Sequence, residues 1–312
     1  MKKFVIQLFL FCLFFLLFDK LFIIIRNHSP STEIDQRMEL LINKKINKDI
    51  IIIGSSRGAR DIIASQIENE TGQTAYNLSY DASAIEFHEF ILRTLVKFNK
   101  TPKTILLVID DNSELLSDNP IKYRFDRLYP LVKYSYIRNE LINRGEKNKH
   151  LSDLFVLHQL DKSNFNLKRK KFTPVDTIMS CGSMPLWFHN ENRRWKFISD
   201  PITSVEDQDP TKIVAFKNFV KICEQYNIKL ILVFPPNFKP LNTSCLNTLM
   251  NVVKKRASIF TYDINNPVYK DKMYFYDEFH LLHKGAEIFT HEISLYINNL
   301  INKVDYNKPN SQ

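Results

Sequence analysis

The sequence predicts an α/β fold: a central parallel sheet of about five strands with helices on both faces, a helical insertion and an N-terminal transmembrane helix. Three observations support this. Short runs of β-branched and aliphatic residues recur along the chain, segments with helical spacing separate them, and one long apolar run lies at the N-terminus. Continuously apolar strands are typical of a parallel sheet that is buried on both faces. With 312 residues, 44% of them hydrophobic, the chain can bury the core of one large domain.

Five segments have the composition of buried strands. They are residues 50–53, 75–78, 104–109, 230–234 and 259–262. The first consists of consecutive isoleucines and is closed by Gly54, which is a clear strand signal. With the helices between them, the strands give the order βαβαβ, insertion, αβαβα, which predicts parallel pairing and helices on both faces.

Helices are expected between these strands from apolar spacing and from their start signals. Residues 61–67 are expected to form one helix. Ser83 and Glu86 are expected to form a capping box at the start of the next helix, since each side chain could bond the other's backbone N–H. Asp209, directly before a proline, predicts the start of a third helix. The last helix is expected from Lys284.

Residues 113–208 interrupt this pattern with aromatic, proline and basic residues and no clear alternation. The stretch is too long for a simple loop, so we expect a helical insertion or a cap over the sheet edge. It contains the basic cluster 168–171, part of a net charge of +9. No RNP-like, zinc-finger or helix-turn-helix pattern accompanies this charge, so no nucleic acid is expected as a partner. A solvated basic loop and attraction to an anionic envelope surface remain the two interpretations.

The N-terminal segment predicts a membrane helix. Residues 4–18 are almost all apolar, Asp19 and Lys20 interrupt them, and 21–25 are apolar again. A helix rising ~1.5 Å per residue covers about 33 Å over residues 4–25, enough to cross a bilayer core. Lys20 would lie toward the far side, where its long side chain can reach the interface.

A cleaved signal peptide is the alternative to a retained anchor. Cleavage requires small residues at the cut site, and residues 1–26 contain none, so an uncleaved signal-anchor fits better. Lys2 and Lys3 favour an N-terminus that stays inside. We therefore expect a single-pass protein of the cytoplasmic (inner) membrane, with its domain on the extracytoplasmic side. The expected segments are a signal-anchor at 1–26, a stalk or lead-in helix at 27–48, an α/β domain at 49–302 with the insertion at about 113–208, and a flexible tail at 303–312.

Polar side chains lie at the carboxyl ends of several predicted strands, where ligands bind in open α/β sheets. They are Ser56, Asn77, Ser79, Asn112, Asp277 and His280. Because the carboxyl ends of parallel strands meet at one edge of the sheet, we expect these side chains to gather there. Their shared position predicts a functional site at that edge.

Three of these residues have the chemistry of a nucleophilic site. Ser56 follows a glycine turn at a helix start, where its backbone N–H could stabilise a developing oxyanion. Such a serine can instead be a helix cap or part of a phosphate-binding turn. His280, three residues after Asp277, can donate Nδ1–H to that carboxylate and use its other nitrogen to take a proton from serine. A surface Asp–His pair is the alternative interpretation.

No metal and no cofactor are expected. His280 and His283 could bind a metal ion, but no further clustered ligands accompany them, and the four cysteines form no CxxC pair. A nucleotide-binding Rossmann-like domain is a third possibility, but the first strand lacks a following G-x-G-x-x-G.

Gly-Ser-Ser at 54–56 and Asp-Glu-Phe-His at 277–280 bracket the predicted domain. These motifs resemble the first and last blocks of the SGNH/GDSL hydrolase superfamily, which includes esterases, lipases, deacetylases and acyltransferases. Ser55 stands where that family usually has Asp. The resemblance implies a flavodoxin-like three-layer sandwich with Ser56 as the nucleophile. Asp277 and the histidine three residues after it would complete the triad.

The middle motifs are less similar to the family. Ser79 closes an Asn-Leu-Ser that looks like the second block, and it stands where an oxyanion-hole glycine usually stands. Asn112 closes an Asp-Asp-Asn that resembles Gly-x-Asn of the third block without its glycine. The resemblance covers about 49–112 and 211–300. It implies that the Ser79 backbone N–H and the Asn112 side chain belong to the oxyanion hole.

The expected function is that of a membrane-anchored serine esterase, O-acyl hydrolase or acyltransferase. Together with the expected anchor, the Gly-Ser-Ser-Arg form of the first block at 54–57 is similar to the envelope-anchored members of the family. This resemblance implies acylated envelope glycans or related esters as substrates, and envelope polysaccharide-assembly proteins as partners. The alternative is a catalytically inactive protein of the same fold that binds a glycan or a partner in cell-surface polymer assembly.

Overall fold

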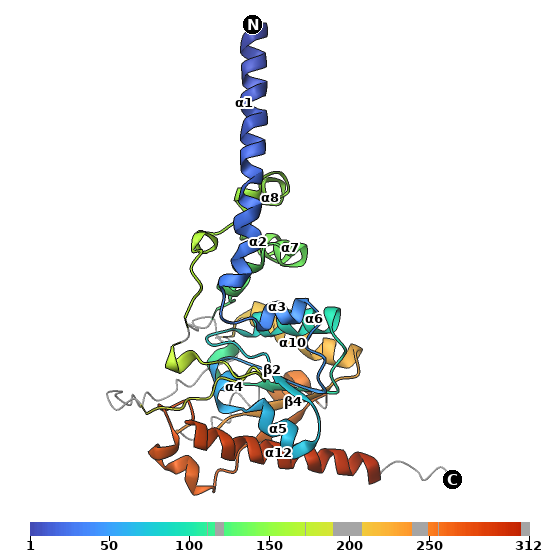
Figure 1. Ribbon diagram of the computed structural model, residues 1–312. Coiled ribbons are helices and arrows are strands. Elements are labelled where there is room, and N and C mark those ends of the chain that lie inside the picture. The colour runs from blue at the N-terminus through green and yellow to red at the C-terminus, as the bar shows by residue number, and fades with distance from the viewer. Residues whose placement is uncertain are drawn as a thin grey trace. The chain divides into compact units, whose positions relative to one another are not determined.

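Five parallel strands form one sheet (Figure 1). They are β1 (Ile50–Ile53), β2 (Ala75–Asn77), β3 (Thr104–Val108), β4 (Lys229–Phe234) and β5 (Ser258–Thr261). Their order across the sheet is β2-β1-β3-β4-β5, the order of flavodoxin-like α/β sheets. The predicted fold class, with about five parallel strands, is therefore confirmed.

The chain divides into two compact units. The computed structural model describes residues 1–110, 112–115, 122–171, 173–189, 208–238, 249–254 and 256–306. The first unit consists of Met1–Glu39 and Arg124–Phe172, and the second consists of Leu40–Tyr123 and Thr173–Gln312. The sheet lies in the second unit.

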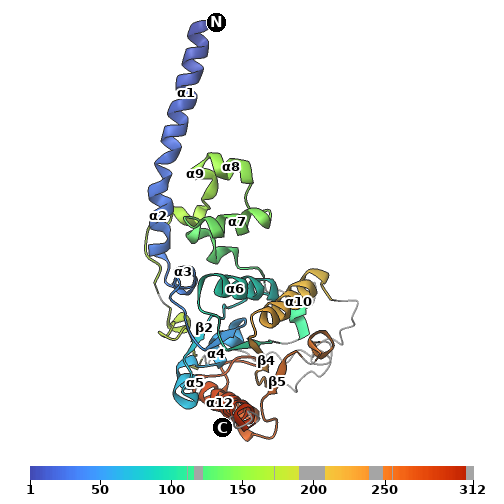
Figure 2. The same cartoon turned by 90° about the vertical axis from the view of Figure 1, so that its right-hand side faces the viewer.

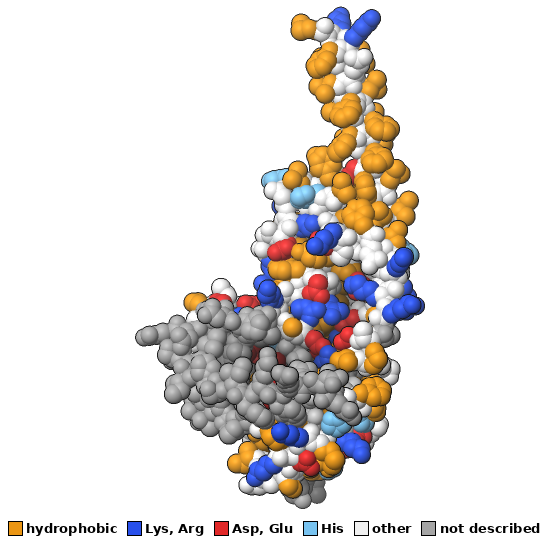
Figure 3. All heavy atoms as spheres, turned by 90° about the vertical axis from the view of Figure 1, so that its left-hand side faces the viewer, with side chains coloured by type: hydrophobic (Ala, Val, Ile, Leu, Met, Phe, Trp, Pro, Cys, Tyr) orange, Lys and Arg blue, Asp and Glu red, His pale blue; other side chains and the backbone are white. Residues whose placement is uncertain are grey.

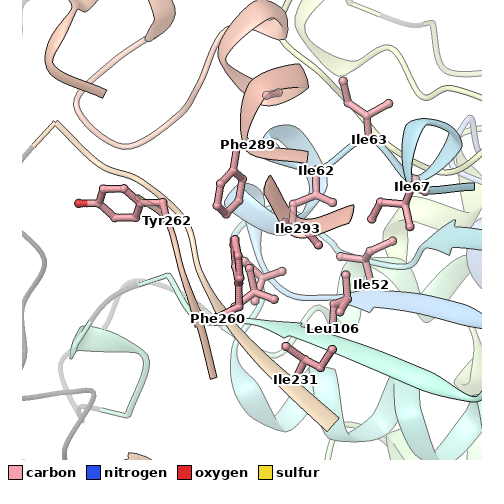
Figure 4. Packing of buried hydrophobic residues seen from close by; sticks show 14 of the residues in the cluster. Ile52, Ile62, Ile63, Ile67, Leu106, Ile231, Phe260, Tyr262, Phe289 and Ile293 are labelled. Atoms are coloured by element: carbon pink, nitrogen blue, oxygen red, sulfur yellow. The ribbon is translucent and has the colours of Figure 1, made fainter. Parts of the chain in front are cut away.

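One face of the sheet packs against α5 (Ala64–Thr71) and α12 (His283–Tyr306). Ile52, Leu106 and Ile231 are neighbours across β1, β3 and β4, so their side chains point to the same face. They form one buried cluster with Phe289 and Ile293 of α12 (Figure 4). The strand residues are fully apolar here because helices cover both faces of the sheet.

The opposite face is covered by α6 (Ile85–Phe98) and α10 (Pro210–Gln225), as Figure 2 shows. Both helices bury apolar side chains. These are Phe87, Phe90, Ile91 and Leu95 of α6, and Phe216, Phe219, Val220 and Cys223 of α10. The predicted start of α10 is confirmed, since the Asp209 carboxylate accepts the backbone N–H of Thr211.

The single helix predicted at 61–67 is instead two helices, α4 (Ser56–Asp61) and α5, with Ile62 and Ile63 extended between them. The break buries both isoleucines in the core. Partners from distant segments replace the lost helical hydrogen bonds: Asn77 donates to the Ile62 carbonyl, and Ile63 N–H donates to Thr290. Apolar spacing alone could not show this break, because the replacement partners come from β2 and α12.

The capping box predicted at Ser83 and Glu86 is wrong. The N-cap of α6 is Ala84, and no side chain caps the helix. The Ser83 hydroxyl instead contacts the Tyr80 carbonyl and the ring of His88. The Ser83 hydroxyl therefore pairs with a buried imidazole on the first turn of α6 and does not cap the helix.

The predicted helical insertion contains short helices up to Asp176 in its described part, whereas residues 177–189 form turns and an isolated β-bridge. It contains short 3-10 helices and three α-helices, α7 (Ser135–Asn143), α8 (Lys149–Leu154) and α9 (Val156–Gln159). Residues 124–172 belong to the first unit, together with α1 (Lys2–Lys20) and α2 (Phe22–Thr32). The segment Lys2–Thr32 is long and apolar enough to cross a membrane, and 6% of its most apolar window is buried.

Two predicted segments remain, the lead-in at 27–48 and the tail at 303–312. Between 27 and 48 the chain contains the end of α2 and the short helix α3 (Arg37–Ile42). At the other end, α12 continues through Tyr306, and residues 307–312 of the expected tail lie outside the described residues.

Candidate active site

Ser56 is the first residue of α4, directly beyond the carboxyl end of β1. The turn requires Gly54, because a Cβ atom there would lie 2.8 Å from the Cβ of Val108 on β3. Ser55, not Ser56, occupies the N-cap position. The Ser56 hydroxyl is therefore not used as a helix cap, and the residue is only half-buried.

Asp277 and His280 form a tight turn whose geometry is set by the carboxylate. Asp277 Oδ1 accepts the backbone N–H groups of Phe279 and His280, each at 2.8 Å. The same carboxylate lies 2.9 Å from His280 Nδ1 through each of its oxygens. Because Asp277 is buried and acts only as an acceptor, Nδ1 carries the proton and Nε2 is left as the acceptor nitrogen.

The three residues predicted as a triad form one continuous chain of hydrogen bonds. His280 Nε2 lies 2.8 Å from Ser56 Oγ, although 224 positions separate the two residues in sequence. The His280 side chain is 20% exposed and Asp277 is 1% exposed. The histidine is therefore partly exposed, whereas the carboxylate behind it is shielded from solvent.

Arg57 ties together the strand ends around this site, a role that the sequence did not indicate. Its buried guanidinium donates to the backbone carbonyls of Asp110, after β3, and of Pro235 and Pro236, after β4. Pro235 and Pro236 have no backbone N–H and so predicted the end of β4, but nothing in the sequence linked their carbonyls to Arg57.

Asp61, at the end of α4, supports the turn that carries His280. Its Oδ1 accepts the backbone N–H of Leu281 at 2.9 Å, and its Oδ2 lies 3.8 Å from Arg57 Nε. Complete burial raises the pKa of the Asp61 carboxyl well above its usual range, and nearby Asp277 raises it further, while Arg57 opposes the shift. Asp61 therefore positions the histidine from beneath without touching it.

The two predicted oxyanion residues are Ser79 and Asn112. Ser79 is completely buried, and its backbone N–H donates to the Asn77 side chain at 2.9 Å. Its hydroxyl packs against Gly58 of α4, where a Cβ atom would come within 2.6 Å of Ser79 Oγ. The side chain of Asn112 lies outside the described residues. The oxyanion role of both residues stays a prediction.

A second serine–histidine–carboxylate set lies in the same unit and was missed from the sequence. Ser83 Oγ lies 2.8 Å from His88 Nε2, and His88 Nδ1 lies 3.2 Å from Glu114 Oε1. The second contact lacks the alignment of a hydrogen bond. All three side chains are buried. No sequence motif marked this set, since the Ser83 motif has the form of a helix cap.

His283, considered as a metal ligand, has a different environment. Its ring stacks on Trp187 with centroids 3.8 Å apart, and its Nδ1 lies 3.6 Å from Glu287. Within the described part of the chain, no three His, Cys, Asp or Glu side chains cluster as metal ligands.

Comparisons with known proteins give one distant relative. No family model matches the chain. The chain is 22% identical over 167 residues to an uncharacterized protein, MJ0414, of Methanocaldococcus jannaschii. That alignment covers 46% of this chain and 40% of the relative, so the chain spans less than half of the relative's length.

Proposed function

We propose that this protein is a membrane-anchored serine esterase, O-acyl hydrolase or acyltransferase of the SGNH/GDSL type. The observation that carries the proposal is the unbroken chain from Ser56 through His280 to Asp277, with contacts of 2.8 and 2.9 Å. The flavodoxin-like strand order supports it, because such folds place ligands beyond the carboxyl ends of the strands. The proposed substrates are acylated envelope glycans or related esters.

In the proposed reaction, Ser56 Oγ attacks the ester carbonyl carbon while His280 Nε2 takes the hydroxyl proton. Asp277 holds the protonated imidazole through Nδ1–H. The imidazolium then gives its proton to the leaving alkoxide as the carbon–oxygen bond breaks, which leaves an acyl ester on Ser56. Water or a sugar hydroxyl attacks this ester, with His280 again as the base, and gives hydrolysis or acyl transfer.

The oxyanion of each tetrahedral intermediate needs hydrogen-bond donors. The Ser56 backbone N–H suits this role, because the first N–H groups of a helix have no acceptor within the helix. We propose the Ser79 N–H and the Asn112 side chain as the other donors. For Ser79 this requires that its N–H be shared between Asn77 and the substrate.

We further propose that α1 anchors the protein in the cytoplasmic membrane with the second unit on the extracytoplasmic side. The apolar length of Lys2–Thr32 supports a span. Lys2 and Lys3, at the short end, support the orientation.

One observation favours a second candidate, a non-catalytic protein that binds a glycan or an assembly partner at the same site. The complete burial of Ser79 and the engagement of its N–H leave this oxyanion donor occupied. In that case the serine and histidine would contact a ligand without covalent chemistry.

Trapping of the acyl-enzyme separates the two candidates. The full-length protein in detergent is mixed with p-nitrophenyl acetate, quenched in acid and analysed by peptide mass spectrometry. The enzyme proposal predicts one acetyl group on the peptide that contains Ser56, and none in Ser56→Ala. Absence of acetylation in a folded wild-type protein, together with no release of p-nitrophenol, would favour the binding candidate.

A further inference from the structure

Asp19 interrupts the apolar N-terminal helix, and a carboxylate at this position would be costly in contact with lipid. It is buried and accepts two backbone N–H groups, from Val156 at 2.7 Å and Leu157 at 2.8 Å. These are the first two residues of α9, so Asp19 satisfies N–H groups that a helix start leaves without partners. The membrane helix therefore carries a built-in attachment point for the insertion.

Further polar contacts continue this attachment along the same helix and into α2. Lys20 donates to the carbonyl of Leu154 at 2.8 Å. Six residues after Lys20, on α2, Arg26 donates to the Gln159 side chain at 2.9 Å. Both contacts join segments more than a hundred positions apart in sequence and lie within the first unit.

Aromatic pairs fix the depth of the attachment. Phe15, inside the apolar run, packs edge-on against Phe155 with ring centroids 5.8 Å apart. Phe22 packs in the same way against Phe165 at 6.1 Å. A helix needs about 20 residues to cross the hydrocarbon core, so a span that starts at Phe4 includes both contact points. For such a span, the attached residues lie beside its second half, toward the boundary where the span ends.

These attached residues expose apolar side chains, as a surface in contact with lipid would. Five of them, on α8, α9 and the segment that follows, are between 42% and 53% exposed: Leu151, Leu154, Leu157, Phe165 and Leu167. Figure 3 shows hydrophobic side chains along α1 and around its C-terminal end. Exposed lysines at 149, 162 and 168 lie in the same segment and can reach headgroup phosphates.

We propose that residues 149–167 form a lipid-embedded collar, which enters the headgroup and acyl-chain boundary of the bilayer that α1 crosses. The proposal rests on the proposed membrane anchor. The apolar side chains of the collar continue the apolar surface of α1, and Asp19 joins the two without exposing its charge. The collar gives a role to the basic insertion: it holds the first unit against the membrane surface.

Depth-dependent fluorescence quenching tests the collar in the full-length protein, reconstituted in phosphatidylcholine vesicles. Trp187 and Trp195 are replaced by Phe, and one new tryptophan is introduced per variant. Leu154→Trp reports the collar, Phe9→Trp reports the anchor, and Val214→Trp, an exposed position on α10, is the matched control. Quenching by lipids with brominated acyl chains is compared with quenching by acrylamide from water.

The collar predicts that brominated lipid quenches Leu154→Trp several-fold more strongly than Val214→Trp, with the opposite order for acrylamide. Leu157→Trp should repeat the result independently. Strong lipid quenching of Phe9→Trp alone, with Leu154→Trp and Leu157→Trp quenched only from water, would overturn the collar and leave the anchor intact. Absence of lipid quenching at Phe9→Trp as well would overturn the anchor and the collar together.

Discussion

The second unit contains two serine–histidine–carboxylate sets built from the same side-chain chemistry. In one set, Ser56 reaches Asp277 through His280 by an unbroken chain of aligned hydrogen bonds. In the other, Ser83 contacts His88 at 2.8 Å, but the imidazole is not aligned with the carboxylate beyond it. Both sets border the Gly54 turn, since the Ser83 hydroxyl lies 3.3 Å from the Gly54 carbonyl.

The difference lies in exposure and in where the serine proton goes. Ser83 is fully buried and donates to the Tyr80 carbonyl at 2.6 Å, so its proton is held by the backbone. Ser56 is half-buried and His280 is partly exposed. Residue types alone therefore do not define a nucleophilic site. The two sets also differ in the exposure of the serine and in the alignment of the relay, and both differences favour the proposed role of the Ser56 set.

Replacing each histidine should give the largest difference in kcat between the two sets. His280→Ala removes the proposed general base, and we expect kcat for p-nitrophenyl acetate to fall about 10⁶-fold, as for other serine triads. His88→Gln should leave kcat per folded molecule within a few-fold of the wild type. Comparable losses in both variants, with folding intact by circular dichroism, would show that the comparison assigns the wrong histidine or that both sets act together.

Replacing the carboxylates tests the relay. Asp277→Asn keeps an oxygen for the Phe279 and His280 N–H groups but places an NH₂ near Nδ1, which favours the wrong tautomer. We expect kcat to fall about 10⁴-fold. Glu114→Gln, which keeps an acceptor for the Asp110 N–H, is the matched control and should retain activity. Full activity in Asp277→Asn would exclude an orienting role for this carboxylate.

The pH dependence of stability tests Asp61. Because its folded-state pKa is raised, the stability that it contributes is fully present below its unfolded-state pKa and is lost as pH rises through the folded-state value. Asp61→Asn cannot ionise, so the wild type should lose stability relative to this variant as pH rises. The expected slope is at most about 1.4 kcal/mol per pH unit.

Chemical unfolding of both proteins in detergent, at intervals from about pH 4 to pH 8, measures this difference. Parallel stability curves for the wild type and Asp61→Asn would contradict the assigned ionisation. Retained kcat in Asp61→Asn would agree with a positioning role, since the Asn oxygen can still accept the Leu281 N–H.

Ser83→Ala should have the smallest effect. It removes buried hydrogen bonds to Tyr80 and His88, which is expected to cost about 1–3 kcal/mol of unfolding free energy. Acyl turnover should stay within a few-fold of the wild type. A loss of turnover as large as that of a triad variant would make the buried set part of the catalytic apparatus.

The sequence predicted those features that depend on local composition. The isoleucine run of β1 and the Asp–x–x–His turn have signals within a few residues, and the structure places both as expected. Ser56 was predictable from its position after a strand. Its approach to His280 was also expected, from the shared strand-end position and the family resemblance, and the 2.8 Å contact itself depends on how distant segments of the chain pack.

The features missed depend on partners that are distant in sequence. The break at Ile62 is stabilised by Asn77 and by Thr290, and Arg57 binds carbonyls after β3 and β4. Local spacing contains no information about such contacts. The Ser83 cap failed for a related reason: the Ser83 hydroxyl bonds the Tyr80 carbonyl and the ring of His88, in a buried site at the start of α6.

Labelling with a serine-reactive fluorophosphonate tests most directly whether Ser56 is an activated nucleophile. The wild type, Ser56→Ala and Ser83→Ala are labelled as full-length proteins in native membranes. We predict labelling of the wild type and of Ser83→Ala, and none of Ser56→Ala. Labelling of Ser56→Ala at the wild-type level, or no labelling of a folded wild type, would contradict the assignment of Ser56 as the nucleophile.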